Sequence, residues 1–212
     1  MANNFFNKIV KNVSADATLP SEVYAVPASK KTIVIELDVA NRSTSSQTIS
    51  VEIEDYSARA ANAVKTCVDA AISSNTIVTG SAHGFATGDR VLLVNTGTSG
   101  IQYNSAELSK VAWWFVIYVN ATSFKLATSH TNATAGTFIT LTGDTDAAGS
   151  DKDDFQLITT AYIVRDAPIP IGGALKVIAG QKLVLEAQDS LEITASTASS
   201  VDAIASILED VS

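Results

Sequence analysis

Side chains suited to catalysis are few in this chain. It contains two histidines, His83 and His130, and a single cysteine, Cys67. A hydrolytic triad needs a histidine base held by an acid beside a nucleophile, and neither histidine lies in a G-x-S-x-G motif. Two histidines and one cysteine do not make a Cys/His zinc site of the usual spacing, and no phosphate-binding G-x-x-x-x-G-K-S/T loop occurs. The sequence therefore predicts no catalytic residue, no cofactor and no enzymatic activity.

One segment, residues 144–154 (DTDAAGSDKDD), offers alternating carboxylates, and Ca²⁺ prefers oxygen ligands of this kind. The EF-hand pattern fails, because Ala148 occupies the third ligand position and no glutamate closes the loop. We interpret the segment as a solvated acidic loop, with a calcium site as the alternative. The carboxylates of that alternative are those of Asp144, Asp146, Asp151 and Asp153.

Three further carboxylates lie close together at Glu52, Glu54 and Asp55. A pair of carboxylates is the machinery of glycoside hydrolysis. Strand alternation places Glu52 and Glu54 on one face of a strand. We expect this face to be the outward one, so that both glutamates are surface charges and not a catalytic pair.

Adjacent tryptophans, Trp113 and Trp114, lie in the longest apolar stretch, residues 111–119 (VAWWFVIYV). Successive residues of a strand point to opposite faces, so one indole can be exposed while the other is buried. An exposed indole, together with Tyr103 or Tyr118, would form a contact site for a host-surface glycan. The alternative is that both indoles are covered.

The composition is that of a folded protein, with 46% hydrophobic and 17% charged residues. A formal net charge of −8 gives no long-range attraction to phosphates, so we expect no nucleic-acid partner. No apolar run approaches the length of about 20 residues that a membrane span needs, and no membrane partner is expected. One cysteine excludes an intrachain disulfide framework, in keeping with folding in a reducing cytosol.

Period-two alternation of apolar and polar residues marks the strands that must position any site. It is clear in residues 31–40 and 48–55, and it resumes in residues 160–166 and near the end of the chain in residues 201–208. Strands about every ten residues, without a long helical period, predict an all-β fold with an antiparallel β-sandwich. The side chains that we expect to be mostly buried in it are Ile33, Ile35, Leu37, Ile49, Val51 and Ile53.

Residues 48–55 and 160–166 resemble the two arms of one hairpin, separated by a Gly-, Ser-, Thr- and Asn-rich block. A hairpin tip accepts insertions at low cost. We therefore predict a discontinuous sandwich of residues 21–61 and 159–212, and a second small β-domain of residues 62–158 inserted in the hairpin loop.

Residues 1–20 precede the first clear strand, and we predict that they form an N-terminal arm. Its apolar residues, Phe5, Phe6, Ile9 and Val10, have spacing that fits a short amphipathic helix, which would need a partner to be stable. Burying each can contribute about 1.5–3 kcal/mol. We expect these four residues to be assembly contacts, ordered against a neighbouring subunit more than against their own domain; the alternative is a frayed terminus.

Residues 81–91 (SAHGFATGDRV) have the chemistry of a tight turn. Gly84 and Gly88 permit positive φ, and Asp89 can accept hydrogen bonds from turn amides. Phe85 can fill a core, and we expect His83 to be a structural imidazole bonded to the turn.

Two sets of segments resemble bacteriophage families. Residues 81–91, with 115–120 (FVIYVN) and 122–127 (TSFKLA), are similar to small β-modules of phage tail and virion proteins. Residues 23–41, 161–193 and 199–209 resemble a family of small structural β-sandwich proteins of tailed phages, especially those of marine bacteria. Members of that family typically lack a large insert.

The resemblance implies a non-enzymatic structural subunit of a tailed-phage virion, located in the neck, tail or baseplate and acting through symmetric multimeric assembly. The implied partners are further copies of the chain and other virion proteins, and the implied location is the virion, assembled in the host cytoplasm. The alternatives are a capsid-surface decoration protein and a host-receptor or carbohydrate-binding module of the tail.

Overall fold

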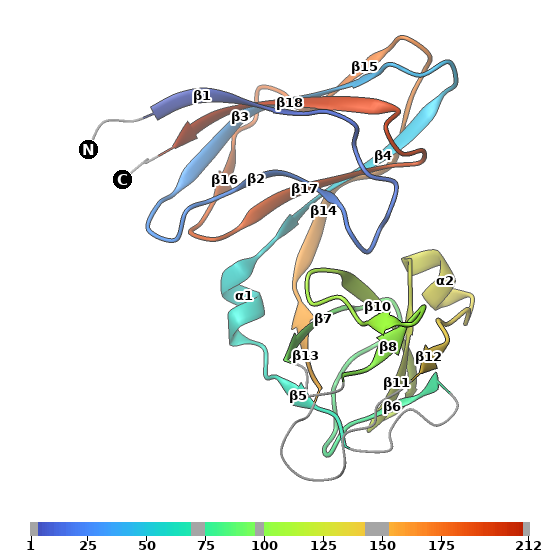
Figure 1. Ribbon diagram of the computed structural model, residues 1–212. Helices are drawn as coiled ribbons and strands as arrows, with labels where there is room; N and C mark the ends of the chain where they lie inside the picture. Colours follow the sequence, from blue (N-terminus) through green and yellow to red (C-terminus); the bar gives the residue numbers. More distant parts are fainter. Residues whose placement is uncertain (1–3, 69–74, 96–99, 143–152, 210–212) are drawn as a thin grey trace. The chain divides into compact units, whose positions relative to one another are not determined.

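The computed structural model describes residues 4–68, 75–95, 100–142 and 153–209 (Figure 1). The chain divides into two compact units. Met1–Ala58 and Thr159–Ser212 form the first unit, and Arg59–Ile158 form the second. Strands dominate both units, which confirms the predicted all-β class. Independent folding of the second unit as an inserted domain stays a prediction.

The first unit contains two antiparallel sheets, here named sheet A and sheet B. Sheet A has the strand order β1–β18–β3–β15, with β16 also paired to β3, and sheet B has the order β14–β4–β17–β2. The strands of sheet A are β1 (Asn4–Val10), β18 (Val201–Glu209), β3 (Thr32–Asn41), β15 (Ala174–Ile178) and β16 (Leu183–Leu185). The strands of sheet B are β14 (Thr160–Ile169), β4 (Gln47–Glu54), β17 (Ser190–Ala195) and β2 (Ser21–Ala25).

One aliphatic core lies between these two sheets. Leu37 of β3 and Ile207 of β18 enter it from sheet A, while Val51 of β4 and Ile193 of β17 enter it from sheet B. All four side chains are fully buried. The shared core makes the first unit an antiparallel β-sandwich, as the alternation predicted.

The prediction for β3 is wrong in its first half. Ser206 pairs with Glu36 and Ile207 pairs with Val34, so that Ile35 is an extra residue, as in a β-bulge. The bulge reverses the face that alternate residues present. Val34 therefore enters the core with Leu37, while Ile33 and Ile35 are only partly buried.

The predicted pairing of residues 48–55 with 160–166 is confirmed. Strand β14 runs antiparallel to β4, from Thr160 opposite Glu54 to Ile169 opposite Gln47, with two register shifts on the way. Ile49 and Val51 of β4 are buried and Ile53 is partly buried against the same core, as expected.

The second unit has a six-stranded sheet in the order β5–β13–β7–β10–β11–β6 and a three-stranded sheet in the order β12–β8–β9. The six strands are β5 (Lys65–Thr66), β13 (Asp154–Ile158), β7 (Arg90–Asn95), β10 (Trp113–Asn120), β11 (Ser123–Ala127) and β6 (Ile77–Val78). The three strands are β12 (Leu141–Thr142), β8 (Gln102–Tyr103) and β9 (Ala106–Glu107).

Two short helices, α1 (Tyr56–Ala61) and α2 (His130–Thr134), were not predicted. Each is too short to give a helical period in the sequence. Helix α2 begins after Ser129, whose hydroxyl accepts a hydrogen bond from the Asn132 amide at 3.1 Å.

The core of the second unit is separate and rich in aromatic side chains. Phe85, Trp114, Phe124 and Phe155 belong to it, and Phe124 and Phe155 are fully buried. The rings of Phe124 and Phe155 pack edge to face, with their centroids 5.5 Å apart.

Candidate functional site

The N-terminal residues form an edge strand of sheet A, not a helix or a separate arm. All seven residues of β1 pair with β18, from Asn4 opposite Glu209 to Val10 opposite Ala203. Phe6 and Val10 point to the core side and pack against the sandwich core. The expectation that all four apolar residues serve a neighbouring subunit is therefore wrong for these two. Phe5 and Ile9 point the other way and are 62% and 61% exposed.

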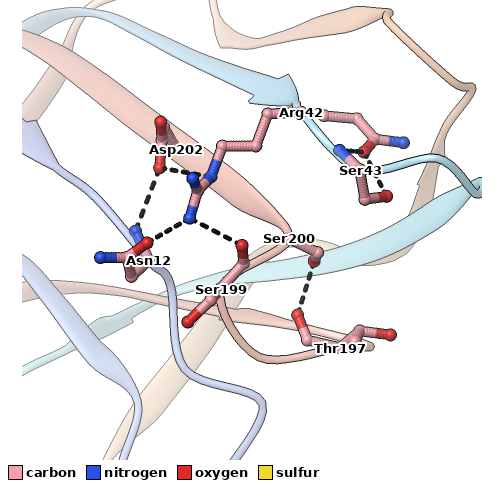
Figure 2. Close-up of polar contacts among 8 residues, drawn as sticks. Asn12, Arg42, Ser43, Thr197, Ser199, Ser200 and Asp202 are labelled. Atoms are coloured by element: carbon pink, nitrogen blue, oxygen red, sulfur yellow. Dashed lines mark hydrogen bonds and ion pairs between the residues drawn. The ribbon is translucent and has the colours of Figure 1, made fainter.

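The chain that leaves β1 is fixed to its own unit by Arg42 (Figure 2). The Arg42 guanidinium forms an ion pair with Asp202, with Nε and Oδ1 3.2 Å apart, and it donates hydrogen bonds to the side chain of Asn12 and the carbonyl of Ser199. The Asn12 amide donates to the same Asp202 carboxylate at 3.0 Å. The predicted boundary between an arm of residues 1–20 and the sandwich is therefore wrong, because these residues are part of the sandwich.

Exposed apolar side chains align in a row across the outer face of sheet A, the face turned away from the core. Phe5 pairs with Leu208, Leu208 with Ile33, and Ile33 with Val184. Leu208 and Ile33 are partly buried, and Val184 is 57% exposed. We call these four residues the apolar row. Directly opposed side chains on one face lie within contact range, so the row is a continuous apolar strip over four strands.

The rest of this outer face is mixed in character. Ile9 lies opposite Ile204, which is 48% exposed, and forms a second apolar pair. Asn7 lies between Phe5 and Ile9, and its side chain accepts a hydrogen bond from the Ser206 hydroxyl. A face with this pattern of apolar and uncharged polar groups is suited to packing against another protein surface.

Farther across the face, Lys176 of β15 forms ion pairs with Glu36 and Asp38 of β3. The hydrogen bond from Lys176 lowers the pKa of Glu36 and raises the pKa of Lys176 itself. Both groups therefore stay charged at neutral pH, which marks the border of the apolar part of the face.

Sheet B carries the opposite kind of feature on its non-core face, a row of glutamates. Glu192 of β17 lies directly opposite both Glu52 of β4 and Glu22 of β2. Glu52, Glu54 and Glu192 are all buried, so the expectation that Glu52 and Glu54 are surface charges is wrong. Alternation had separated them correctly from the core residues of β4, but alternation alone does not determine which face is exposed.

Burial raises the pKa of Glu192 to about 8, and the nearby charges of Glu22 and Glu54 add to the increase. The Ser190 hydroxyl donates a hydrogen bond to Glu192 Oε1 at 2.9 Å, which acts in the opposite direction. Glu192 is therefore protonated at neutral pH. A protonated carboxyl reduces the repulsion that several carboxylates side by side would otherwise produce.

The predicted turn at residues 81–91 is confirmed in detail. Gly84 and Gly88 have φ of +74° and +94°, and Asp89 accepts a hydrogen bond from the Ala86 amide at 2.7 Å. Phe85 is buried in the core of the second unit. A Cβ atom at Gly88 would lie 2.9 Å from Nε2 of His130, so glycine is required there on two grounds.

His83 is a structural imidazole, as expected. It is buried, its Nδ1 accepts a hydrogen bond from the Phe85 amide at 2.9 Å, and its Nε2 lies 2.8 Å from the carbonyl oxygen of Asn120. With Nδ1 acting as an acceptor, the ring carries its proton on Nε2 and donates it to Asn120. Nδ1 thus stabilises the turn itself, and Nε2 joins the turn to the end of β10.

Both indoles are covered, which is the second of the two alternatives. Trp113 and Trp114 are 6% and 5% exposed. Trp114 belongs to the core of the second unit and donates from Nε1 to the Ser109 carbonyl, while the Arg90 guanidinium lies 5.3 Å from the centre of the Trp113 ring. Because both indoles are buried, they do not form the exposed surface that a glycan contact needs.

Of the calcium candidates, Asp144, Asp146 and Asp151 lie outside the described residues. Asp153 is buried and its Oδ2 accepts a hydrogen bond from the Ile101 amide at 3.1 Å. Among the residues that the structure describes, no group of three or more His, Cys, Asp or Glu is arranged to hold a metal ion.

Sequence reasoning identified Phe5 and Ile9 but missed their partners Leu208, Val184 and Ile204. The signal for Ile204 and Leu208 was present, because both alternate with the core residues of β18 on its more polar face. Val184 has no such signal, since β16 is three residues long.

No family model, curated protein or solved structure matches this chain. In the described part of the chain, no helix has the length and apolar character needed to cross a membrane.

Proposed function

We propose that this chain is a non-enzymatic structural subunit of a tailed-phage virion that acts through multimeric assembly. The observation that carries the proposal is the apolar row on the outer face of sheet A. Single exposed apolar residues are common on proteins, but here the strand register joins two exposed residues, Phe5 and Val184, through the partly buried Leu208 and Ile33 into one strip. An aligned and exposed apolar strip is typical of a protein–protein contact surface.

The energetic argument favours a covered face. Full burial of a side chain such as Phe5, Val184 or Ile204 contributes about 1.5–3 kcal/mol. Many weak contacts of this size, repeated by symmetry, hold a multimeric assembly together. The acidic net charge of −8 keeps free subunits apart and soluble before they assemble.

The resemblance of residues 23–41, 161–193 and 199–209 to small phage structural proteins supports the same function. So does the similarity of residues 81–91 to modules of phage tails. Two of the residues that could act in catalysis or ligand binding have structural roles. His83 stabilises a turn, and Trp114 fills a core.

The proposal is tested by locating the protein. Particles of the phage that encodes the chain would be purified on a density gradient. The chain would then be quantified by mass spectrometry against known capsid and tail proteins. We expect a fixed copy number per particle. Immunogold labelling then separates the neck, tail and baseplate from the capsid surface. Presence only in the particle-free fraction would overturn the proposal.

A sharper version uses Val184→Lys, which places a charge in the apolar row without touching the core. We expect the variant to fold normally and to be incorporated into particles at least tenfold less than the natural chain. Lys182→Arg, at the residue directly before β16, is the matched control and should be incorporated normally.

A further inference from the structure

Strand β1 is a long, regular edge strand with little protection against pairing. In the described part of the chain it pairs only with β18, through seven regular pairs and no bulge. Natural edges are usually blocked by bulges, prolines, charges or short length. The other edges of the sandwich have such features: β14 has Pro168 and two register shifts, β2 and β15 have one shift each, and β16 has three residues.

The single charge of β1 is Lys8, an inward-pointing lysine of the kind that can protect an edge strand, but its charge interacts with Glu209 of its own unit. Lys8 lies on the core side, where its ammonium group is 5.7 Å from the ring centre of Phe6 and 5.8 Å from that of Tyr24. The residues on the outer face are Phe5, Asn7 and Ile9, which carry no charge. The edge is therefore open to another strand.

Symmetry restricts how a second β1 can pair with the first. In an antiparallel pair related by a two-fold axis, the axis is perpendicular to the sheet, so each residue faces one that lies on the same side of the sheet. Same-side residues alternate along a strand. The axis must therefore pass beside a residue that faces its own copy.

The sequence of β1 favours Asn7 as that residue. Pairing about Asn7 uses all seven residues and places Phe5 opposite Ile9 of the second copy. Pairing about Lys8 would oppose two like charges, which is destabilising. Pairing about Phe6 would place Phe5 opposite Asn7 and would pair only residues 4–8 of the described strand.

We propose that two copies of this chain dock through β1, with the strands antiparallel and paired about Asn7. The five-stranded sheet A of each copy then becomes half of one continuous ten-stranded sheet. The two apolar rows lie on the same face of this sheet and form one larger surface. The inference rests on the proposed function, multimeric assembly, because it identifies a second copy of the chain as one partner in that assembly.

A disulfide tests the register directly. Asn7→Cys places two thiols opposite each other at a Cα separation of about 4.5–5.5 Å, within the range for a disulfide. In the matched control Asn4→Cys, the two thiols are six residues apart along the strand, or about 20 Å. The natural Cys67 is buried and common to both variants.

Under mild oxidation, we expect Asn7→Cys to form a covalent dimer and Asn4→Cys to remain uncrosslinked. Dimers in both variants, or in neither, would overturn the proposed register. Sedimentation of the natural chain should show a dimer, and a monomer at every concentration would overturn the proposal as a whole.

Two exposed substitutions separate this inference from the proposed function. Ile9→Lys should weaken dimerisation at least tenfold without changing the melting temperature of the monomer. Val184→Lys lies three strands from β1, about 14 Å away, and should leave the dimer intact while reducing incorporation into particles. A natural chain that is incorporated into particles but never dimerises would refute the β1 pairing alone.

Discussion

The two sheets of the sandwich use their non-core faces in opposite ways. Sheet A exposes apolar side chains such as Phe5 and Val184, whereas sheet B buries the carboxyl groups of Glu52 and Glu192. Residue type by itself would predict the reverse. Exposure on these two faces therefore depends on what packs against each face, and not on the hydropathy of the side chain alone.

The largest effect should come from the core that both sheets share. Leu37→Ala removes a fully buried side chain beside the bulge of β3. We expect the free energy of unfolding to fall by about 2–5 kcal/mol, in urea titrations followed by far-ultraviolet circular dichroism. Val184→Ala on the outer face is the control and should change it by less than about 0.5 kcal/mol. Equal losses would mean that the outer face is also part of a core.

The next effect concerns the glutamates of sheet B. The pKa of Glu192 is raised from 4.5 to about 8 in the folded chain. The native state therefore holds a proton that the unfolded state releases, so this stabilisation is complete below about pH 4.5 and is lost as the pH rises to about 8.

Glu192→Gln removes this dependence. We expect the variant to exceed the natural chain in stability near pH 8 by on the order of 1–3 kcal/mol, and to match it in acid. Glu22→Gln, at the exposed end of the same row, is the control and should give a smaller gain. A natural chain whose stability does not fall as the pH rises from about 4.5 to about 8 would contradict the raised pKa.

A smaller effect of opposite sign is expected for Glu36 on sheet A. Lys176 lowers the pKa of this carboxyl, so its contribution to stability is present above the ordinary value of 4.5 and is lost as the pH falls through the lowered pKa. Because both side chains are exposed, the change is slight. Glu36→Gln should lower the melting temperature slightly at neutral pH and leave it unchanged in strong acid. An increase at neutral pH would mean that the ion pair does not stabilise sheet A.

The smallest effect on the sandwich is expected from removal of most of the second unit. Deleting residues 62–153 and joining the ends with a short turn restores a hairpin between β4 and β14. Circular dichroism should still show a folded β protein with a cooperative thermal transition, and Ile193→Ala in the shortened chain should destabilise it as in the full chain. An unfolded product would show that the sandwich depends on the deleted residues.

Local patterns in the sequence were sufficient for several features. The pairing of β4 with β14 was predicted because two alternating segments flank a block of different composition. The turn at residues 81–91 was predicted because Gly84, Gly88 and Asp89 satisfy its geometry by themselves. The residues that determine the turn lie within the turn itself. The two paired strands share the same alternation of apolar and polar residues.

Other features required the tertiary structure. The spacing of the apolar residues from Asn4 to Val10 fits a helix or a strand. The segment is a strand because it pairs with β18. The bulge at Ile35 follows from the register against β18 and moves Ile33 to the outer face.

The all-β class, the positions of the long strands and, outside the bulge of β3, the division of a strand into two faces follow from the sequence pattern. Which of these faces is buried depends on the tertiary structure. The physical reason is that alternation depends on the backbone of one strand, whereas the burial of Glu52 or the exposure of Phe5 depends on strands far away in the sequence.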